Sequence, residues 1–431
     1  MDAVLCDELL QEILRRLPPS AYPAASLVSR RWFAVLRSSL SSLSLRLPGA
    51  SSTSSWLPRP LSSVRPLTFR WLIRFHSLRE FSVLDCSGSS VTAQASVADD
   101  GAVEAAAVDD GAGVGDEIEE EEGKGLALEV LSLTGIRGGN HGFGWLWRRC
   151  CNLRRLQLRG CEATGDGPAS RSFARCLPNL QELELRTCRA IADVVLLLIA
   201  EHCRCLATLI LYDGGSRDGL HRFIRRCGSG LRTLDLRLPL DLNNGHLVAV
   251  AENFQFLSCL RLQSCCLITG EGLRSLGRAA AGAAIEELVL VNCDVVEREP
   301  GLLTFLGQHL RRLRRLDLSH NEMLLDKELS SMLASCCNLV DIKLRGCKFL
   351  TDASVLSMFR FCGLLETVDI TRCLGITAKA VEFLILNSPR LRQIHVEESK
   401  ISDSASSWAS RRVIQGLFQS FLAIECPCKE D

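Results

Sequence analysis

The stretch Leu339–Cys347, LVDIKLRGC, contains a spacing of residues that recurs along most of the chain. Leu339 is followed three residues later by Ile342, five residues later by Leu344 and eight residues later by Cys347. Copies of this spacing begin at residues 78, 128, 153, 180, 206, 231, 257, 285, 313, 339, 365 and 391. From residue 128 onward, successive copies begin 25 to 28 residues apart. A spacing that stays in register over such a length predicts a chain built from repeated structural units.

Each copy predicts one strand followed by one helix. Ile342 and Leu344 would share one face of an extended strand, since strand side chains alternate between faces. The second half of the unit has helical spacing, as at Val355, Leu356 and Phe359. Such a unit cannot bury its apolar face alone, so neighbours must stack into a curved solenoid with strands on the concave wall. The predicted fold class is therefore α/β, a horseshoe of about 12 repeats with a small all-α module before it.

The repeats resemble the cysteine-containing class of leucine-rich repeat, C-x-x-L-x-x-L-x-L-x-x-C-x-x-[IL]-T-D, most clearly from Cys337 to Asp352. The chain has 21 cysteines. Seven of them lie eight residues after the start of a repeat, which we call the plus-eight position: Cys86, Cys161, Cys188, Cys265, Cys293, Cys347 and Cys373. In one repeat Asn321 occupies this position instead. This regular placement predicts small buried spacers with free thiols. No metal is expected at His202, Cys203 and Cys205, or at Cys426 and Cys428, because neither group has a second ligand pair at finger-like spacing.

The first 45 residues have a different pattern. Apolar residues at 9, 10, 13, 14 and 17 form one stripe of a helix that ends before Pro18, and a second apolar stretch runs from Ala24 to Leu36. This segment resembles an F-box, a small helical module that docks on the adaptor Skp1, in its L-x-x-E-L-L start, Ile-Leu pair and V-S-R-R-W motif. The resemblance assigns Skp1 binding to Leu5, Leu9, Leu10, Ile13, Leu14, Leu17, Val28 and Trp32.

The domain organisation follows from these patterns. We expect the F-box at 1–45, a linker and the opening of the solenoid at 46–77, and leucine-rich repeats at 78–400. Within the repeats, 87–125 would be an acidic disordered insertion, or alternatively an acidic docking tail, because it breaks the period with polar residues. Residues 401–431 would form a C-terminal cap, with a partner-binding helix as the alternative.

Charge and hydropathy exclude several classes of protein. The formal net charge is zero, but the segment 99–122 holds 11 acidic residues and no basic one. The basic surplus elsewhere lacks an aromatic-studded stripe, so nucleic acid is not expected as a partner. No apolar run has the length of a membrane span, and the acidic start MDAVLCDELL does not resemble a secretory signal. We expect an intracellular protein, in the cytoplasm, the nucleus or both, with no membrane association.

The concave wall would be formed by the residues at plus two, plus four and plus six of each strand. The plus-four and plus-six positions give mixed charges with two apolar islands, one at Ile210 and one at Val289. Protein interfaces favour apolar and aromatic anchors with arginine around them. We therefore expect a protein ligand at Ile210, Tyr212, Arg237, Arg261 and Val289, against the alternative that this wall is ordinary solvated surface.

The two resemblances together imply a non-catalytic adaptor. The F-box would bind a Skp1-type adaptor and, through it, a cullin, in an SCF ubiquitin ligase, and the repeats would bind an unknown protein substrate for proteasomal degradation. No residue motif marks a catalytic site, and no cofactor is expected. Two alternatives stay open. One is a leucine-rich scaffold or inhibitor outside SCF complexes, with the first 45 residues as a cap, and the other is a hormone co-receptor with a ligand-shaped concave pocket.

Overall fold

The computed structural model describes residues 6–17, 21–47, 72–73, 75–85, 125–136, 143–164, 171–228, 230–239, 242–279, 284–401 and 404. The expected acidic insertion at 87–125 and the expected C-terminal cap at 401–431 lie almost wholly outside these residues. In the ranges just given, no helix is both long and apolar enough to cross a membrane.

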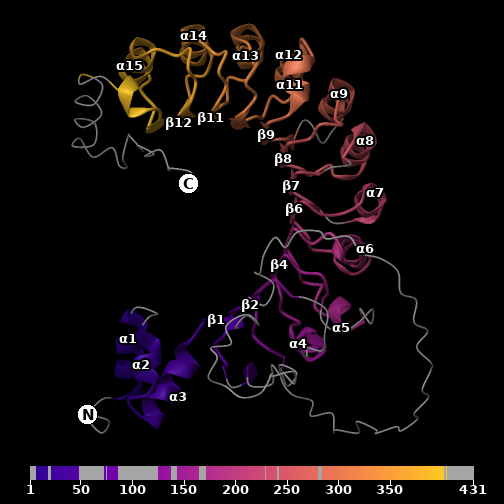
Figure 1. Ribbon diagram of the computed structural model, residues 1–431, viewed down its shortest axis with the longest axis vertical. Helices are drawn as coiled ribbons and strands as arrows, with labels where there is room; N and C mark the ends of the chain where they lie inside the picture. The colour runs from indigo at the N-terminus through magenta and orange to yellow at the C-terminus, as the bar shows by residue number, and fades with distance from the viewer. Residues whose placement is uncertain are drawn as a thin grey trace, which may run out of the picture.

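One parallel sheet of 13 strands, in chain order, lines the inner wall of an arc whose helices lie on the outer side (Figure 1). The predicted leucine-rich repeat solenoid is confirmed. Twelve of the strands begin two residues after a predicted repeat start, as β11 does at Asp341. The strands are β1 Ser42–Leu47, β2 Glu80–Asp85, β3 Val130–Thr134, β4 Arg155–Arg159, β5 Glu182–Arg186, β6 Thr208–Tyr212, β7 Thr233–Arg237, β8 Cys259–Gln263, β9 Glu287–Val291, β10 Arg315–Asp317, β11 Asp341–Lys343, β12 Thr367–Asp369 and β13 Gln393–His395.

The helices fall into a module of three before the sheet and a series that alternates with the strands. The N-terminal module consists of α1 Asp7–Arg16, α2 Tyr22–Ser26 and α3 Arg30–Ser39. The outer series consists of α4 Phe143–Arg149, α5 Arg171–Ala174, α6 Ala192–His202, α7 Arg217–Arg226, α8 Asn244–Asn253, α9 Gly270–Arg278, α11 Asp294–Arg298, α12 Leu302–His309, α13 Asp326–Leu333, α14 Asp352–Phe361 and α15 Ala378–Asn387. A short 3-10 helix, η3, spans Glu398–Lys400.

The sheet begins one strand earlier than the sequence pattern predicts. β1 pairs in parallel with β2, with Leu43 opposite Phe81 and Leu45 opposite Val83. The spacing of a repeat is present here too, since Leu43 and Leu45 follow Leu40 by three and five residues. Leu43 and Leu45 pack against the solenoid core, whereas Leu40 packs against the core of α1–α3. Because only two residues separate α3 from β1, the three-helix module is coupled directly to the sheet.

A single apolar core runs along the solenoid between the sheet and the outer helices. In β6, Leu209 and Leu211 are buried, while Thr208, Ile210 and Tyr212 are half-buried and face the concave side. Burying one leucine side chain stabilises a fold by roughly 1.5–3 kcal/mol, and this alternation recurs strand after strand. Each repeat therefore depends on its neighbours for most of its apolar burial.

The plus-eight cysteines tie successive repeats together. Five buried thiols among the described residues donate hydrogen bonds to the carbonyl of the plus-five residue in the preceding repeat, for example from Cys347 to Leu318 at 3.2 Å and from Cys373 to Leu344 at 3.0 Å; the other three are those of Cys161, Cys188 and Cys293. Cys265 instead donates to Gln263 of its own repeat, and Cys86 lies outside the described residues. Burial raises the pKa of the Cys373 thiol to about 11. These observations support the prediction of small buried spacers, and they add a specific hydrogen bond that the sequence did not reveal.

A second set of contacts links the helix starts. Thr351 caps α14 by accepting from the Ala353 amide, and its own amide donates to Asp326 of the previous repeat at 3.0 Å. One repeat later, Thr377 caps α15 and its amide donates to Asp352 at 2.7 Å. The Thr-Asp pair of the repeat motif thus satisfies free amides at a helix start and joins neighbouring repeats.

Asn321 replaces cysteine in one repeat and gives a test of the plus-eight contact. Its Nδ2 donates to the carbonyls of Leu290 and Leu318, both at 2.8 Å, and its Oδ1 accepts from the Cys293 amide at 2.9 Å. We predict that Asn321→Ala lowers the free energy of unfolding by about 3 kcal/mol, because several buried backbone groups lose their partner. Urea denaturation followed by circular dichroism measures this loss.

The matched control for this prediction is Asn338→Ala. Asn338 also donates to a backbone carbonyl, that of Arg311 at 3.1 Å, but at an exposed site where water replaces the lost bond. Asn321→Cys should restore part of the stability, because the neighbouring repeats use a thiol there. Equal losses from Asn321→Ala and Asn338→Ala would contradict the role given to the plus-eight position.

Candidate functional site

The three-helix module has its own core, separate from that of the solenoid. The Ser29 hydroxyl caps α3 by accepting from the Trp32 amide at 3.2 Å. Arg31 of α3 forms an ion pair with Asp7 of α1 at 2.7 Å. These contacts fix α3 against α1 and hold the module as a unit. Its buried core residues are Leu10, Leu14, Ala25, Val35 and Leu36.

The predicted Skp1-binding residues fall into three groups. Leu9, Ile13 and Val28 are 55%, 41% and 59% exposed, and so present apolar side chains to solvent. Leu17 and Trp32 are half-buried and pack against the module's core. Leu5 lies outside the described residues.

Two further predicted residues lie in the module's core. Leu10 and Leu14 are completely or almost completely buried, because the same face of α1 must close the module's core. They can therefore support a binding surface but do not form one in this structure.

The sequence prediction also omitted two exposed apolar residues of the module. Leu27 is 86% exposed between α2 and α3, and Phe33 on α3 is 46% exposed. Leu27 directly precedes the V-S-R-R-W motif and Phe33 directly follows it. Their position beside this motif was the sequence feature that could have identified them as binding residues. We call these two side chains, with Leu9, Ile13 and Val28, the module's apolar surface, meaning its exposed large apolar side chains. Phe33 also lines a hollow between the module and the first strands.

On the concave wall, the register of the sheet places the five predicted ligand-binding residues on four adjacent strands. Ile210 lies opposite Asp235, which lies opposite Arg261, and Arg261 in turn lies opposite Val289. Tyr212 lies opposite Arg237 one step further along the strands. The residues named from sequence are thus neighbours in the structure, spread over β6 to β9.

The two arginines of this group are already paired within the wall. Arg237 donates to both carboxylate oxygens of Asp235, at 2.9 and 2.8 Å. Arg261 lies between two carboxylates, donating to Glu287 at 2.6 Å and lying 3.8 Å from Asp235. Asp235 and Glu287 are buried, so the arginines supply the charge that these carboxylates need.

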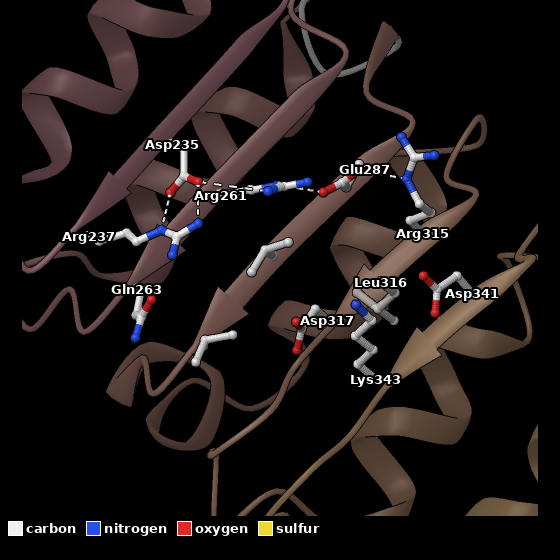
Figure 2. Close-up of a pocket in the computed structure, with 12 residues that line it drawn as sticks. Asp235, Arg237, Arg261, Gln263, Glu287, Arg315, Leu316, Asp317, Asp341 and Lys343 are labelled. Carbon is white, nitrogen blue, oxygen red and sulfur yellow. Dashed lines mark hydrogen bonds and ion pairs between the residues drawn. The ribbon is translucent and has the colours of Figure 1, made fainter. Parts of the chain in front are cut away.

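A hollow of about 560 Å³ lies over β7 to β11 (Figure 2). Arg237, Arg261 and Val289 line it, whereas Ile210 and Tyr212 do not. Its volume falls within the usual range of ligand pockets. The complete lining is Asp235, Arg237, Arg261, Gln263, Glu287, Val289, Val291, Arg315, Leu316, Asp317, Asp341 and Lys343.

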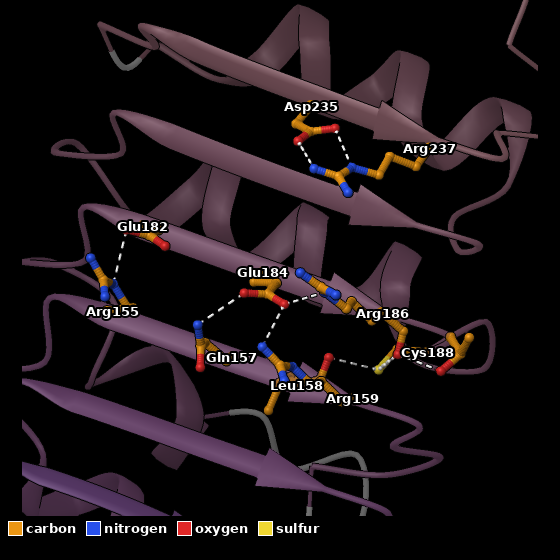
Figure 3. Close-up of polar contacts among 11 residues, drawn as sticks. Arg155, Gln157, Leu158, Arg159, Glu182, Glu184, Arg186, Cys188, Asp235 and Arg237 are labelled. Atoms are coloured by element: carbon orange, nitrogen blue, oxygen red, sulfur yellow. Dashed lines mark hydrogen bonds and ion pairs between the residues drawn. The ribbon is translucent and has the colours of Figure 1, made fainter. Parts of the chain in front are cut away.

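A similar cluster neutralises the wall nearer the N-terminal end. Glu184 of β5 is buried and pairs with Arg159 at 3.0 Å and with Arg186, and it accepts from Gln157 at 2.9 Å (Figure 3). The same view shows the Cys188 thiol donating to the Leu158 carbonyl at 3.3 Å. The concave wall of these repeats is therefore a network of ion pairs rather than a field of free charges.

The carboxylates of the hollow differ in their titration. Burial alone would raise the pKa of Glu287, but the hydrogen bonds and charges of Arg261 and Arg315 outweigh it and hold that pKa below its ordinary value. Burial raises the pKa of Asp341, where the pull of Lys343 is too weak to compensate. One carboxylate is thus stabilised as an anion and the other is not.

Comparison with known proteins identifies the class of the two parts. The F-box domain family matches residues 4–42. The chain therefore carries an F-box domain at its N-terminus, followed by a leucine-rich repeat solenoid.

Among curated relatives, the chain is 28% identical to the DNA repair protein rhp7 of Schizosaccharomyces pombe, over 50% of this chain and 39% of that protein. It is 27% identical to F-box/LRR-repeat protein 4 of Bos taurus, over 42% of this chain and 29% of that protein. The matched region thus spans less than half the length of either relative. A solved structure of the yeast Rad7 and Elc1 complex aligns with a TM-score of 0.49 and 17% identity, covering 66% of this chain and 72% of that one.

The pairing of Glu287 predicts a defined dependence of stability on pH. Glu287→Gln should lower the free energy of unfolding at pH 7 by about 2 kcal/mol, because charge-assisted hydrogen bonds to two arginines are lost. The folded pKa lies below the ordinary value of 4.5, so the loss should be constant above that value. It should shrink as the pH falls through the folded pKa, where the native carboxylate also becomes protonated.

Chemical denaturation at several pH values measures this dependence. The matched control is Glu286→Gln, which changes the adjacent exposed carboxylate and should alter stability little at any pH. A loss from Glu287→Gln that grows as the pH falls would contradict the assigned ion pairs.

Proposed function

We propose that this protein is the substrate-recognition subunit of an SCF ubiquitin ligase. In this proposal the F-box domain binds a Skp1-type adaptor, through which a cullin is recruited, and the concave wall binds a target protein. The observation that carries the proposal is the set of exposed apolar side chains on the F-box domain. This domain lies at one end of the open solenoid (Figure 1). The protein itself would be non-catalytic, and its targets would be marked for proteasomal degradation.

The alternative is a leucine-rich scaffold or inhibitor in which α1–α3 only cap the first repeat. A cap would bury its apolar stripe against the repeats. Instead, Leu9, Ile13 and Val28 are exposed, and the module keeps a separate core. The exposed surface therefore favours a docking role for the module over capping.

The mechanism of such an adaptor is tethering. β1 follows α3 after two residues, so the F-box and the first strand are joined with little freedom between them. A target held on the concave wall would then keep a restricted position relative to the adaptor. Holding two proteins in one assembly raises their effective concentration and makes ubiquitin transfer between them efficient.

For the target surface we keep the five residues proposed from sequence, with different roles. Ile210, Tyr212 and Val289 are half-buried and have no ion-pair role, so they are free to act as anchors. Arg237 and Arg261 hold buried carboxylates and would shape the surface around those anchors. Tyr212 is the most informative residue to change, since its loss removes a large aromatic side chain without breaking an ion pair.

Adaptor binding is tested by co-expression with Skp1 and affinity purification. We predict that Skp1 co-purifies with the native chain and is lost from Leu9→Asp combined with Val28→Asp, because the apolar contact would receive two charges. Leu267→Asp is the matched control, since Leu267 is 53% exposed, close to the 55% of Leu9, but lies in the solenoid. Equal retention of Skp1 by all three proteins would contradict the proposal. If the folded native chain retains no Skp1, the scaffold alternative takes its place.

Target binding gives a second prediction. For a target captured with the native chain, Tyr212→Ala should weaken binding by ~1 kcal/mol or more, because aromatic anchors dominate such interfaces. Isothermal titration calorimetry with the purified target measures the change. Phe256→Ala is the control, since Phe256 is 70% exposed but lies outside the five-residue surface. An unchanged affinity for Tyr212→Ala would remove Tyr212 from the proposed surface.

A further inference from the structure

The buried carboxylates of the concave wall are paired with arginine, whereas the half-buried Asp341 of the hollow forms no ion pair among the described residues. Glu184, Asp235 and Glu287 each lie within ion-pair distance of two arginines. On β11, the Oδ1 atom of Asp341 is buried, and among the described residues it has no hydrogen-bond partner. A buried carboxylate oxygen without a partner is unfavourable and therefore marks a site where a ligand can supply one.

The nearest cations of the wall do not supply that partner. Arg315 lies directly opposite Asp341 in the sheet, but its Nε donates to Glu287 at 2.6 Å. Lys343 is on the same strand and exposed, and it forms no ion pair among the described residues. Figure 2 shows Asp317, Asp341 and Lys343 without contacts between them, whereas Asp235, Arg261 and Glu287 are linked in series.

The hollow therefore has two unlike ends with an apolar floor between them. Toward β7, Arg237 and Arg261 are engaged by Asp235 and Glu287. Toward β11, Asp317 and Asp341 lie near two cations, of which Arg315 is held by Glu287 and Lys343 forms no ion pair among the described residues. The valines of β9, Val289 and Val291, lie in the lining between the two ends.

We infer that this hollow binds a lysine or arginine side chain of the target protein, with its cation on Asp341 and a neighbouring aliphatic side chain on Val289 and Val291. A cationic group provides the hydrogen-bond donor that Asp341 Oδ1 lacks. Asp317, one strand away, adds negative charge to the same end of the hollow. The inference rests on the proposed function, because it specifies which feature of a target the concave wall selects.

An anionic ligand fits this geometry less well. Arg237, Arg261 and Arg315 are held by Asp235 and Glu287, so an anion would have to displace carboxylates that are already buried with them. That leaves Lys343 as the one cation of the lining without an ion pair among the described residues. A phosphate or an acidic peptide would also be repelled by Asp341 and Asp317.

The test is selection from a randomised peptide library displayed on phage, with the full chain as bait. The native chain should enrich peptides in which lysine or arginine is next to Leu, Ile or Val. The selected peptides should bind Asp341→Asn about tenfold or more weakly, since the cation loses its charged partner. Fluorescence polarisation with the same peptides, and with copies carrying norleucine in place of the basic residue, measures both effects.

Two controls separate binding from folding. Asp369→Asn makes the same change on β12, outside the hollow, where the carboxylate already accepts from the Thr371 amide at 3.0 Å. It should bind the peptides as the native chain does. Asp341→Asn should have a thermal midpoint no lower than that of the native chain, because it removes the charge of a half-buried carboxylate whose buried Oδ1 has no partner among the described residues.

The inference is overturned if no peptide is enriched, if the enriched peptides are acidic or lack a basic residue, or if Asp341→Asn binds them unchanged. Skp1 co-purification with the same preparations distinguishes failure of the inferred ligand from failure of the proposed function. If Skp1 is retained while the peptide results are negative, only the choice of ligand is wrong. If cationic peptides depend on Asp341 while Skp1 is not retained, the hollow's chemistry stands and the ligase assignment fails.

Discussion

The structure depends on the hydrogen bond from the plus-eight side chain to the carbonyl of the preceding repeat. Cys188 donates to Leu158, Asn321 to Leu290 and Cys373 to Leu344, each across one repeat boundary. The contact satisfies a buried carbonyl where each short strand ends and turns. Among the described residues this bond is present at six repeat boundaries, those of residues 161, 188, 293, 321, 347 and 373. Because a solenoid has contacts only between neighbours, each such bond helps to hold two adjacent strands in register. The aligned concave rows follow from that register together with the pairing of the strands.

Aligned rows bring charged side chains of neighbouring strands within reach of one another. Strands lie about 4.8 Å apart, so a long arginine can reach carboxylates on either side, as Arg261 does with Asp235 and Glu287. Much of the wall is thereby neutralised within itself. What remains for a partner is the set of features that the network leaves unpaired: half-buried Ile210 and Tyr212, the valines of β9, and Asp341. At the N-terminal end, the F-box keeps its apolar surface exposed and is joined to the sheet by a connection of two residues.

Much of this architecture could be predicted from the sequence because one spacing encodes it. The plus-three and plus-five apolar residues placed twelve strands correctly, and the F-box motif was read from residues such as Trp32. The first strand was missed because Leu40, Leu43 and Leu45 lie among serines directly after a helix, with Pro48 in place of the cysteine. The ion pairs were missed for a different reason. Glu287, Arg315 and Asp341 occupy the plus-two row, and only the contacts between neighbouring strands reveal which arginines are already engaged.

The most direct test of the division of labour between the F-box and the solenoid is hydrogen–deuterium exchange of the full chain with and without Skp1. Our account predicts added protection in α1 and in the segment from α2 to the start of α3, around Leu9, Val28 and Phe33. Exchange on β6 to β11 should be unchanged, leaving the concave wall open to a target. Protection that appears on the concave strands instead, or no protection anywhere, would contradict the account.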